Sequence, residues 1–146
     1  MKTMISVLFA ALIAQGIHAQ TDTFFRQNSI QVHASAMFFY VAGANFETYL
    51  WEKPKTVSGI SFGAGYFSDG GIEVPVHIYT LWNKTSVHHL ELDYGINLLV
   101  DPQDRFLPLP TLSLGYRYQN LSRKGFLIRG GLNLWIIPYL SIGYAF

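Results

Sequence analysis

Charged side chains inside otherwise apolar stretches are the first pointer to chemistry in this sequence. Glu91 and Asp93 are two residues apart in the run Leu-Glu-Leu-Asp-Tyr, so on a β-strand both side chains point to one face. Arg117 and Arg129 hold the corresponding position in two later apolar stretches. Buried charges must be paired and hydrogen-bonded. We therefore predict that the two arginines neutralise the two carboxylates in a structural network; the alternative is a ligand site or a path for protons or ions.

Three histidines, His33, His77 and His89, share that face in the alternating pattern, and histidines beside carboxylates suggest a metal site. They lie in three separate apolar stretches, and none has a second histidine two residues away. His88 is adjacent to His89, so these two rings point to opposite faces. We expect no metal and no other cofactor.

The elements that carry these residues alternate between large apolar residues and small or polar ones with a period of two. This alternation is typical of β-strands whose two faces meet different surroundings. Turn-forming residues (Asp, Asn, Gly, Pro and Ser) separate the alternating runs. The pattern predicts eight strands, at 29–40, 44–52, 57–67, 72–82, 86–99, 108–119, 125–134 and 138–146.

The boundary between the first two strands is the least defined, because the apolar parity runs unbroken from Ile30 to Leu50. One bent strand fits this pattern, and so does a hairpin with an odd-length turn near Gly43. We expect the hairpin, because single-chain bacterial barrels normally have an even number of strands.

Composition limits what the chain can be. Of the 146 residues, 50% are hydrophobic, 16% are aromatic and only 13% are charged, whereas soluble domains average roughly 25% charged residues. The chain has no cysteine, which excludes a thiolate metal site, a disulfide framework and a cysteine nucleophile. It is long enough for one domain. No basic stripe is present, so we expect no nucleic-acid partner.

Residues 1–19 are typical of a secretory signal peptide. Lys2 is followed by an apolar run from Met4 to Ala14, and a small residue, Ala19, precedes the expected cleavage site. The apolar run is too short to span a membrane as a helix, which needs about 20 residues. We therefore assign 1–19 to a signal peptide and 20–146 to a single β-barrel domain, whose formal net charge is zero.

The character of the two strand faces predicts which one is inside. The polar face holds mostly glycine, serine and asparagine with isolated charges, which suits the cramped interior of a small barrel. The other face holds large aliphatic and aromatic side chains, as expected against lipid. Closing the sheet removes edges whose backbone groups would be unpaired in lipid. The predicted fold is an all-β, eight-stranded, antiparallel, up-and-down transmembrane β-barrel; the alternative is a secreted soluble β-barrel that binds an apolar ligand.

The predicted turns sort by charge between the two ends of such a barrel. The turns at 52–56, 83–85 and 120–124 share one end and contain several lysines and arginines. The connections at 68–71, 100–107 and 135–137 share the other end, where Asp69, Asp101 and Asp104 lie. Trp51 and Trp82 are near strand ends, where interfacial aromatic girdles are expected.

Four segments, at 90–95, 115–119, 125–131 and 140–146, carry a likeness to a known family, which is strongest after residue 86. They resemble small outer-membrane β-barrel proteins of Bacteroidetes-type bacteria. It implies a cell outer membrane location after export and supplies no catalytic residues. The terminal Phe146, with Tyr144, resembles the strand that such barrels present to their assembly machinery. The resemblance implies that machinery and outer-membrane lipid as partners, with Phe146 at the periplasmic end.

Some eight-stranded outer-membrane barrels act on lipid A through a membrane-facing His-Ser pair, and Ser86 and His88 share the outward parity. Ser86 falls in a predicted turn, and no third group of the right parity supports the pair. We predict that the protein is not an enzyme. The expected role is structural or interactive, with a lumen filled by side chains; a lipid-modifying enzyme is the alternative.

Overall fold

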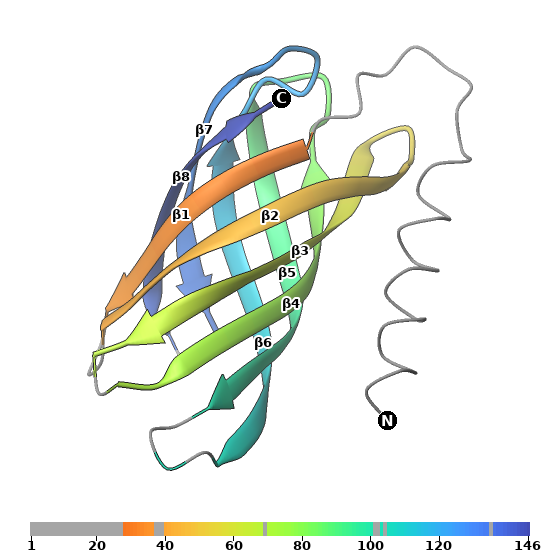
Figure 1. The fold of residues 1–146 in the computed structure, drawn as a ribbon. Helices are drawn as coiled ribbons and strands as arrows, with labels where there is room; N and C mark the ends of the chain where they lie inside the picture. Colours follow the sequence, from red (N-terminus) through yellow and green to blue (C-terminus); the bar gives the residue numbers. More distant parts are fainter. Residues whose placement is uncertain (1–27, 37–39, 69, 101–102, 104, 135) are drawn as a thin grey trace, which may run out of the picture.

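The protein is an eight-stranded antiparallel β-barrel, seen from the side in Figure 1. The computed structural model describes residues 28–36, 40–68, 70–100, 103, 105–134 and 136–146. Each strand pairs with the next in sequence, and β1 also pairs with β8, which closes the sheet. In the described part of the chain, no helix is long and apolar enough to cross a membrane. The strands are β1 (Asn28–Ala36), β2 (Tyr40–Glu52), β3 (Thr56–Phe67), β4 (Ile72–Trp82), β5 (His88–Val100), β6 (Phe106–Tyr118), β7 (Gly125–Asn133) and β8 (Pro138–Ala145).

This architecture confirms the predicted all-β fold class and corrects the first hairpin. Residues 30–36 and 40–50 lie in two antiparallel strands, with Ala36 paired to Tyr40, so the interpretation as one bent strand is wrong. The predicted turn near Gly43 is also wrong, because Gly43 lies inside β2 and pairs with His33 and Gly65. A Cβ atom at Gly43 would lie 2.5 Å from the carbonyl oxygen of Ala64. Glycine is therefore needed at this position for close packing of strands, and not for a turn.

The strand β6 starts at Phe106 instead of 108 and includes Pro108 and Pro110. Both prolines pair with β5, opposite Leu98 and Ile96. Pairing with β7 covers only Ser113 to Tyr118, with one further bond from the Leu134 N–H to the Leu112 carbonyl. The N–H and C=O groups of even-numbered β6 residues point to the β7 side, as the bond to Leu112 shows. The two prolines, at even positions, would therefore not have donated a hydrogen bond to β5 in any case. Some other strand boundaries also differ from the predicted ones; β5, for example, spans 88–100 instead of 86–99.

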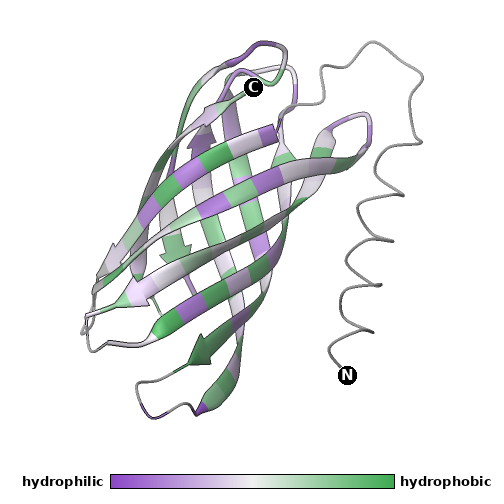
Figure 2. Ribbon diagram, viewed as in Figure 1, coloured by the Kyte–Doolittle hydropathy of each residue, from purple (hydrophilic) through white to green (hydrophobic). Residues whose placement is uncertain are grey.

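The barrel has polar groups inside and apolar groups outside, as predicted from the alternation. Figure 2 shows hydrophobic and hydrophilic residues alternating along the strands. Ile30 and Leu114 on the outer face are 54% and 56% exposed, whereas Glu47 and Glu91 are 1% and 0% exposed. Nearly all the large exposed side chains on the strands are apolar or aromatic. A soluble barrel would place these two classes of residue the other way round.

One end of the barrel interior is filled by an apolar cluster of Val57, Tyr79, Leu81 and Leu121, with Tyr49 packed against it. Leu121 comes from the turn between β6 and β7, at the end of the barrel where the chain terminates (Figure 1). We call this set the apolar plug. It places mostly apolar side-chain surface in the lumen at the C-terminal end, together with the hydroxyl groups of Tyr49 and Tyr79.

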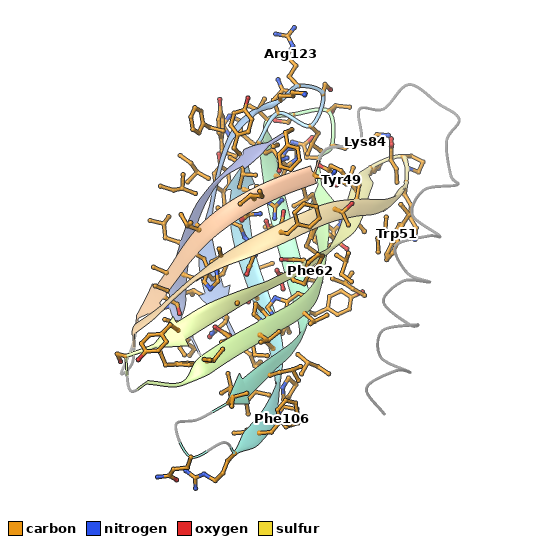
Figure 3. All side chains as sticks on the ribbon, viewed as in Figure 1. Tyr49, Trp51, Phe62, Lys84, Phe106 and Arg123 are labelled. Atoms are coloured by element: carbon orange, nitrogen blue, oxygen red, sulfur yellow. The ribbon has the colours of Figure 1, made fainter. Side chains whose placement is uncertain are left out.

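A β-bulge in β2 brings Trp51 to the outer face. Tyr49 pairs with Gly59 and Trp51 with Ser58, so Leu50 is the extra residue and the side-chain parity changes there. Trp51 and Trp82 are 45% and 36% exposed, close to the C-terminal end of the barrel, and Figure 3 labels Trp51. The two tryptophans thus occupy the positions predicted for an aromatic girdle.

Candidate functional site

Five buried charged residues from four strands of the closed sheet meet in the middle of the lumen. Glu47 comes from β2, Glu91 and Asp93 from β5, Arg117 from β6 and Arg129 from β7. All five are at most 6% exposed. Arg117 and Arg129 are directly opposite each other in the β6–β7 register. Like charges at such positions repel, so carboxylates must lie between them. We call these five residues the lumen network.

Arg117 binds two carboxylates at once. Its Nη1 and Nη2 donate to Oε2 and Oε1 of Glu47 at 2.8 and 2.9 Å, which is a bidentate pair. Its Nε donates to Oε2 of Glu91 at 2.5 Å. The planar guanidinium fork suits this geometry, and such charge-assisted hydrogen bonds are among the strongest in proteins.

Arg129 joins the same carboxylates from the neighbouring strand. Its Nη1 donates to Oε1 of Glu47 at 3.0 Å, and its Nη2 lies 2.9 Å from Oδ2 of Asp93 and 2.5 Å from Oε1 of Glu91. Glu47 and Glu91 therefore each contact both arginines. The result is a connected network in which every charge has a partner of opposite sign.

Aromatic rings complete the packing around the arginines. The Arg117 guanidinium lies 4.9 Å from the ring centroid of Tyr79, and that of Arg129 lies 5.3 Å from that of Tyr139. Gly115 makes room for one of these rings, since a Cβ there would lie 2.3 Å from Tyr139 Oη. Cation–π contacts of this kind add to the attraction when the groups are removed from water.

A line of hydrogen bonds extends from the lumen network toward the other end of the barrel. Asp93 Oδ1 lies 2.9 Å from His77 Nδ1, and His77 Nε2 lies 2.5 Å from Asn97 Oδ1. Asn97 Nδ2 in turn donates to Glu73 Oε1. This half of the lumen is polar, whereas the half at the C-terminal end combines the apolar plug with buried polar side chains such as Gln31, His89 and Gln119.

The structure brings together all four residues predicted from the sequence, Glu91, Asp93, Arg117 and Arg129. Glu47, which contacts both arginines, is not among the residues predicted from the sequence. Its odd number places it on the lumen side of the alternation in β2, and this was the signal available. The alternation does not contain the register of β2 against its neighbours, which brings Glu47 to both arginines.

The three lumen histidines lie in separate surroundings. His77 contacts Asp93 and Asn97, whereas His89 is 1% exposed and its Nε2 lies 2.8 Å from the Gln119 carbonyl oxygen. His33 is partly buried on β1 opposite Gly43. Across the ranges that the structure describes, no three His, Cys, Asp or Glu side chains are grouped to hold a metal ion.

On the outer face, Ser86 contacts the backbone of His88. The His88 N–H donates to Ser86 Oγ at 3.0 Å. The His88 ring instead faces Tyr116, whose hydroxyl is hydrogen-bonded to Nδ1, and it packs 5.5 Å from the ring of Tyr118. In this arrangement the imidazole is a partner of two tyrosines and is not aimed at the serine hydroxyl.

The proposed assembly residues lie at the seam where the barrel closes. Tyr144 and Phe146 are 46% and 40% exposed on the outer face. Tyr144 packs edge-on against Phe126 with ring centroids 5.6 Å apart. Phe146 and Asn28 exchange backbone hydrogen bonds of 2.9 and 3.2 Å, which extends the β1–β8 pairing to the last residue.

No known protein family matches the sequence. No curated protein matches it either. Solved structures do match. The N-terminal β-barrel domain of Pseudomonas aeruginosa OprF aligns with a TM-score of 0.62 at 11% identity, covering 85% of this chain and 100% of that one. A de novo designed transmembrane β-barrel aligns with a TM-score of 0.53 at 9% identity, covering 87% of this chain and 98% of that one. The chain therefore shares the fold of eight-stranded transmembrane β-barrels.

Proposed function

We propose that the protein is a small integral outer-membrane β-barrel whose lumen is closed by its own side chains, with a structural or interaction role and no catalysis. The observation that carries this proposal is the polarity of the closed sheet. Charged residues as buried as Glu47 and Glu91 lie inside, and large apolar side chains cover the outside. Such a surface is favourable in lipid and unfavourable in water.

Two layers support a closed lumen. The lumen network cross-links β2, β5, β6 and β7 through the middle, and the apolar plug fills the C-terminal end. The interior of an eight-stranded barrel is just wide enough for side chains, whereas open diffusion pores need roughly 16–18 strands. A general porin function is therefore not favoured.

The remaining parts of this proposal concern biogenesis. Residues 1–19 would direct export and be removed, and the strand ending in Tyr144 and Phe146 would engage the assembly machinery. The C-terminal end would then face the periplasm. Kinship with small barrels of Bacteroidetes-type, Gram-negative bacteria is proposed from the four segments given above.

The two alternatives have less support. In a lipid-modifying enzyme the imidazole would act on the serine, but the His88 ring is hydrogen-bonded to Tyr116. In a soluble barrel with an apolar ligand, the lumen would be lined by apolar groups, but Glu91, Asp93 and Arg117 occupy its centre. Mass spectrometry of lipid A with and without the gene tests the first alternative; an altered acyl pattern would revive it.

Fractionation combined with a heat-modifiability gel tests the main proposal. The protein should sediment with outer membranes and resist extraction by carbonate. Unheated samples in mild detergent should migrate faster than boiled ones, because a closed barrel stays compact. A protein found entirely in the soluble periplasmic fraction would overturn the proposal.

A further inference from the structure

Five basic residues gather in the three turns at the C-terminal end of the barrel. Lys53 and Lys55 lie in the β2–β3 turn, Lys84 in the β4–β5 turn, and Arg123 and Lys124 in the β6–β7 turn. Figure 3 labels Lys84 and Arg123 at this end, with Phe106 at the opposite end. We call these five residues the basic rim. All but Lys84 are exposed, and the acidic residue beside them, Glu52, pairs with Lys84.

Backbone hydrogen bonds hold the three turns in fixed positions. The Lys53 N–H donates to the Thr56 carbonyl at 2.9 Å, and the Asn83 N–H donates to the Lys55 carbonyl at 3.2 Å, which ties neighbouring turns together. The Gln119 N–H donates to the Val87 carbonyl at 2.9 Å and connects the third turn. The cations are therefore carried by a preorganised edge, and binding there would cost little ordering entropy.

The positive charges face outward, because nothing inside the barrel needs them at this level. The lumen beside the three turns is filled by the apolar plug, including Val57, Leu81 and Leu121. The carboxylates of the lumen network are paired with Arg117, Arg129 and His77, and with none of the rim residues. The basic rim thus presents a net positive charge to the solvent or to the membrane surface.

Aromatic residues fix the depth of the rim. Five aromatic side chains are exposed on the outer face, each close to the end of its strand that lies at this end of the barrel: Trp51, Trp82, Tyr118, Phe126 and Tyr144. Aromatic belts lie at the level of lipid headgroups. Turn residues immediately beyond such a belt are at the depth of the lipid phosphates.

We propose that the basic rim binds the phosphate groups of anionic glycerophospholipids in the leaflet at the C-terminal end of the barrel. Lysine and arginine attract such phosphates electrostatically, and arginine also binds them in bidentate fashion. The proposal rests on the membrane location proposed above. It adds a partner of defined chemistry: a lipid with a net negative headgroup, selected over a zwitterionic one.

Lipids with brominated acyl chains test this selection, because bromine quenches tryptophan fluorescence only at short range. Replacing Trp135, in the β7–β8 connection, by phenylalanine leaves Trp51 and Trp82 as reporters beside the rim. The full chain is refolded into vesicles of phosphatidylcholine with a minor fraction of phosphatidylglycerol. Two samples are compared: in one the phosphatidylglycerol is brominated, and in the other an equal mole fraction of phosphatidylcholine is brominated. We expect brominated phosphatidylglycerol to report an enrichment of about fivefold or more around the reporters, which falls at high salt.

Charge-neutral variants identify the residues responsible. Combined Lys53→Gln, Lys55→Gln, Arg123→Gln and Lys124→Gln changes keep the backbone bonds of the turns and should abolish the preference. Among single changes, Lys124→Gln should lower the preference and Arg105→Gln, at the opposite end, should leave it unchanged. Equal quenching by the two lipids in an inserted protein would overturn this inference. Quenching by neither lipid would mean that the chain does not insert, and would instead contradict the proposed membrane function.

Discussion

At the scale of single residues, Glu47 and Arg117 show how charge is balanced in the lumen. Three carboxylates, Glu47, Glu91 and Asp93, face two arginines, with His77 beside Asp93. Removing an arginine leaves the carboxylates without compensation. Removing the charge of Glu47 leaves two carboxylates against two arginines. The two changes should therefore have unequal effects.

We predict that Arg117→Met lowers the free energy of unfolding by about 3–5 kcal/mol, because it strips buried carboxylates of their partner. Glu47→Gln should cost less, about 1–3 kcal/mol, since the amide oxygen still accepts a hydrogen bond. Urea titration of tryptophan fluorescence in vesicles measures both, with Arg123→Met as an exposed arginine control. Equal stability of the Arg117→Met variant and the wild type would contradict the structural role of the lumen network.

Two glycines of β7 form a matched pair for testing strand contact. A Cβ atom at Gly131 would lie 2.3 Å from the Leu114 carbonyl oxygen and 2.5 Å from the Gly115 Cα, whereas Gly125 has no atom within 4 Å of that position. Gly131→Ala should destabilise the barrel by roughly 1–3 kcal/mol through overpacking. Gly125→Ala should be neutral or stabilise by about 0.4–1 kcal/mol. Similar melting of the two variants in heat-modifiability gels would refute the close approach of β6 and β7.

At the scale of elements, the sequence predicts strands well because each strand meets two different surroundings, which imposes a period of two. It predicts poorly whatever depends on the register between strands. The sequence alone predicts a turn near Gly43, because glycine serves turns and close approaches of two strands equally well. The bulge at Leu50 and the contact of Glu47 with two arginines depend on how β2 is placed against its neighbours, which no single-strand pattern contains.

The β7–β8 connection stores backbone strain at Ile136. This residue has a φ of 60°, a conformation that β-branched side chains rarely adopt, and its side chain is 74% exposed. Ile136→Gly should relieve about 1–3 kcal/mol of strain and raise the melting temperature. Ile136→Val, which keeps the branched Cβ, is the matched control and should show no gain. A loss of stability in the glycine variant would show that the isoleucine side chain contributes more than its backbone costs.

At the scale of the whole molecule, the charge asymmetry between the two ends is linked to orientation. The basic rim lies at the end where β8 terminates, so a periplasmic C-terminus places the rim at the inner leaflet, which holds glycerophospholipid. The opposite orientation would place the same cations outside the cell. Orientation therefore decides which lipids the rim meets.

The absence of cysteine makes this orientation directly measurable. Gln103→Cys, in the β5–β6 connection, and Ser122→Cys, in the β6–β7 turn, place single thiols at exposed positions on opposite ends of the barrel. In intact cells, a membrane-impermeant maleimide should label Gln103→Cys and spare Ser122→Cys, because only the former end faces the medium in the proposed orientation. After permeabilisation of the outer membrane both should react, which controls for thiol reactivity. Labelling of Ser122→Cys alone in intact cells would show the opposite topology, with the basic rim at the outer leaflet.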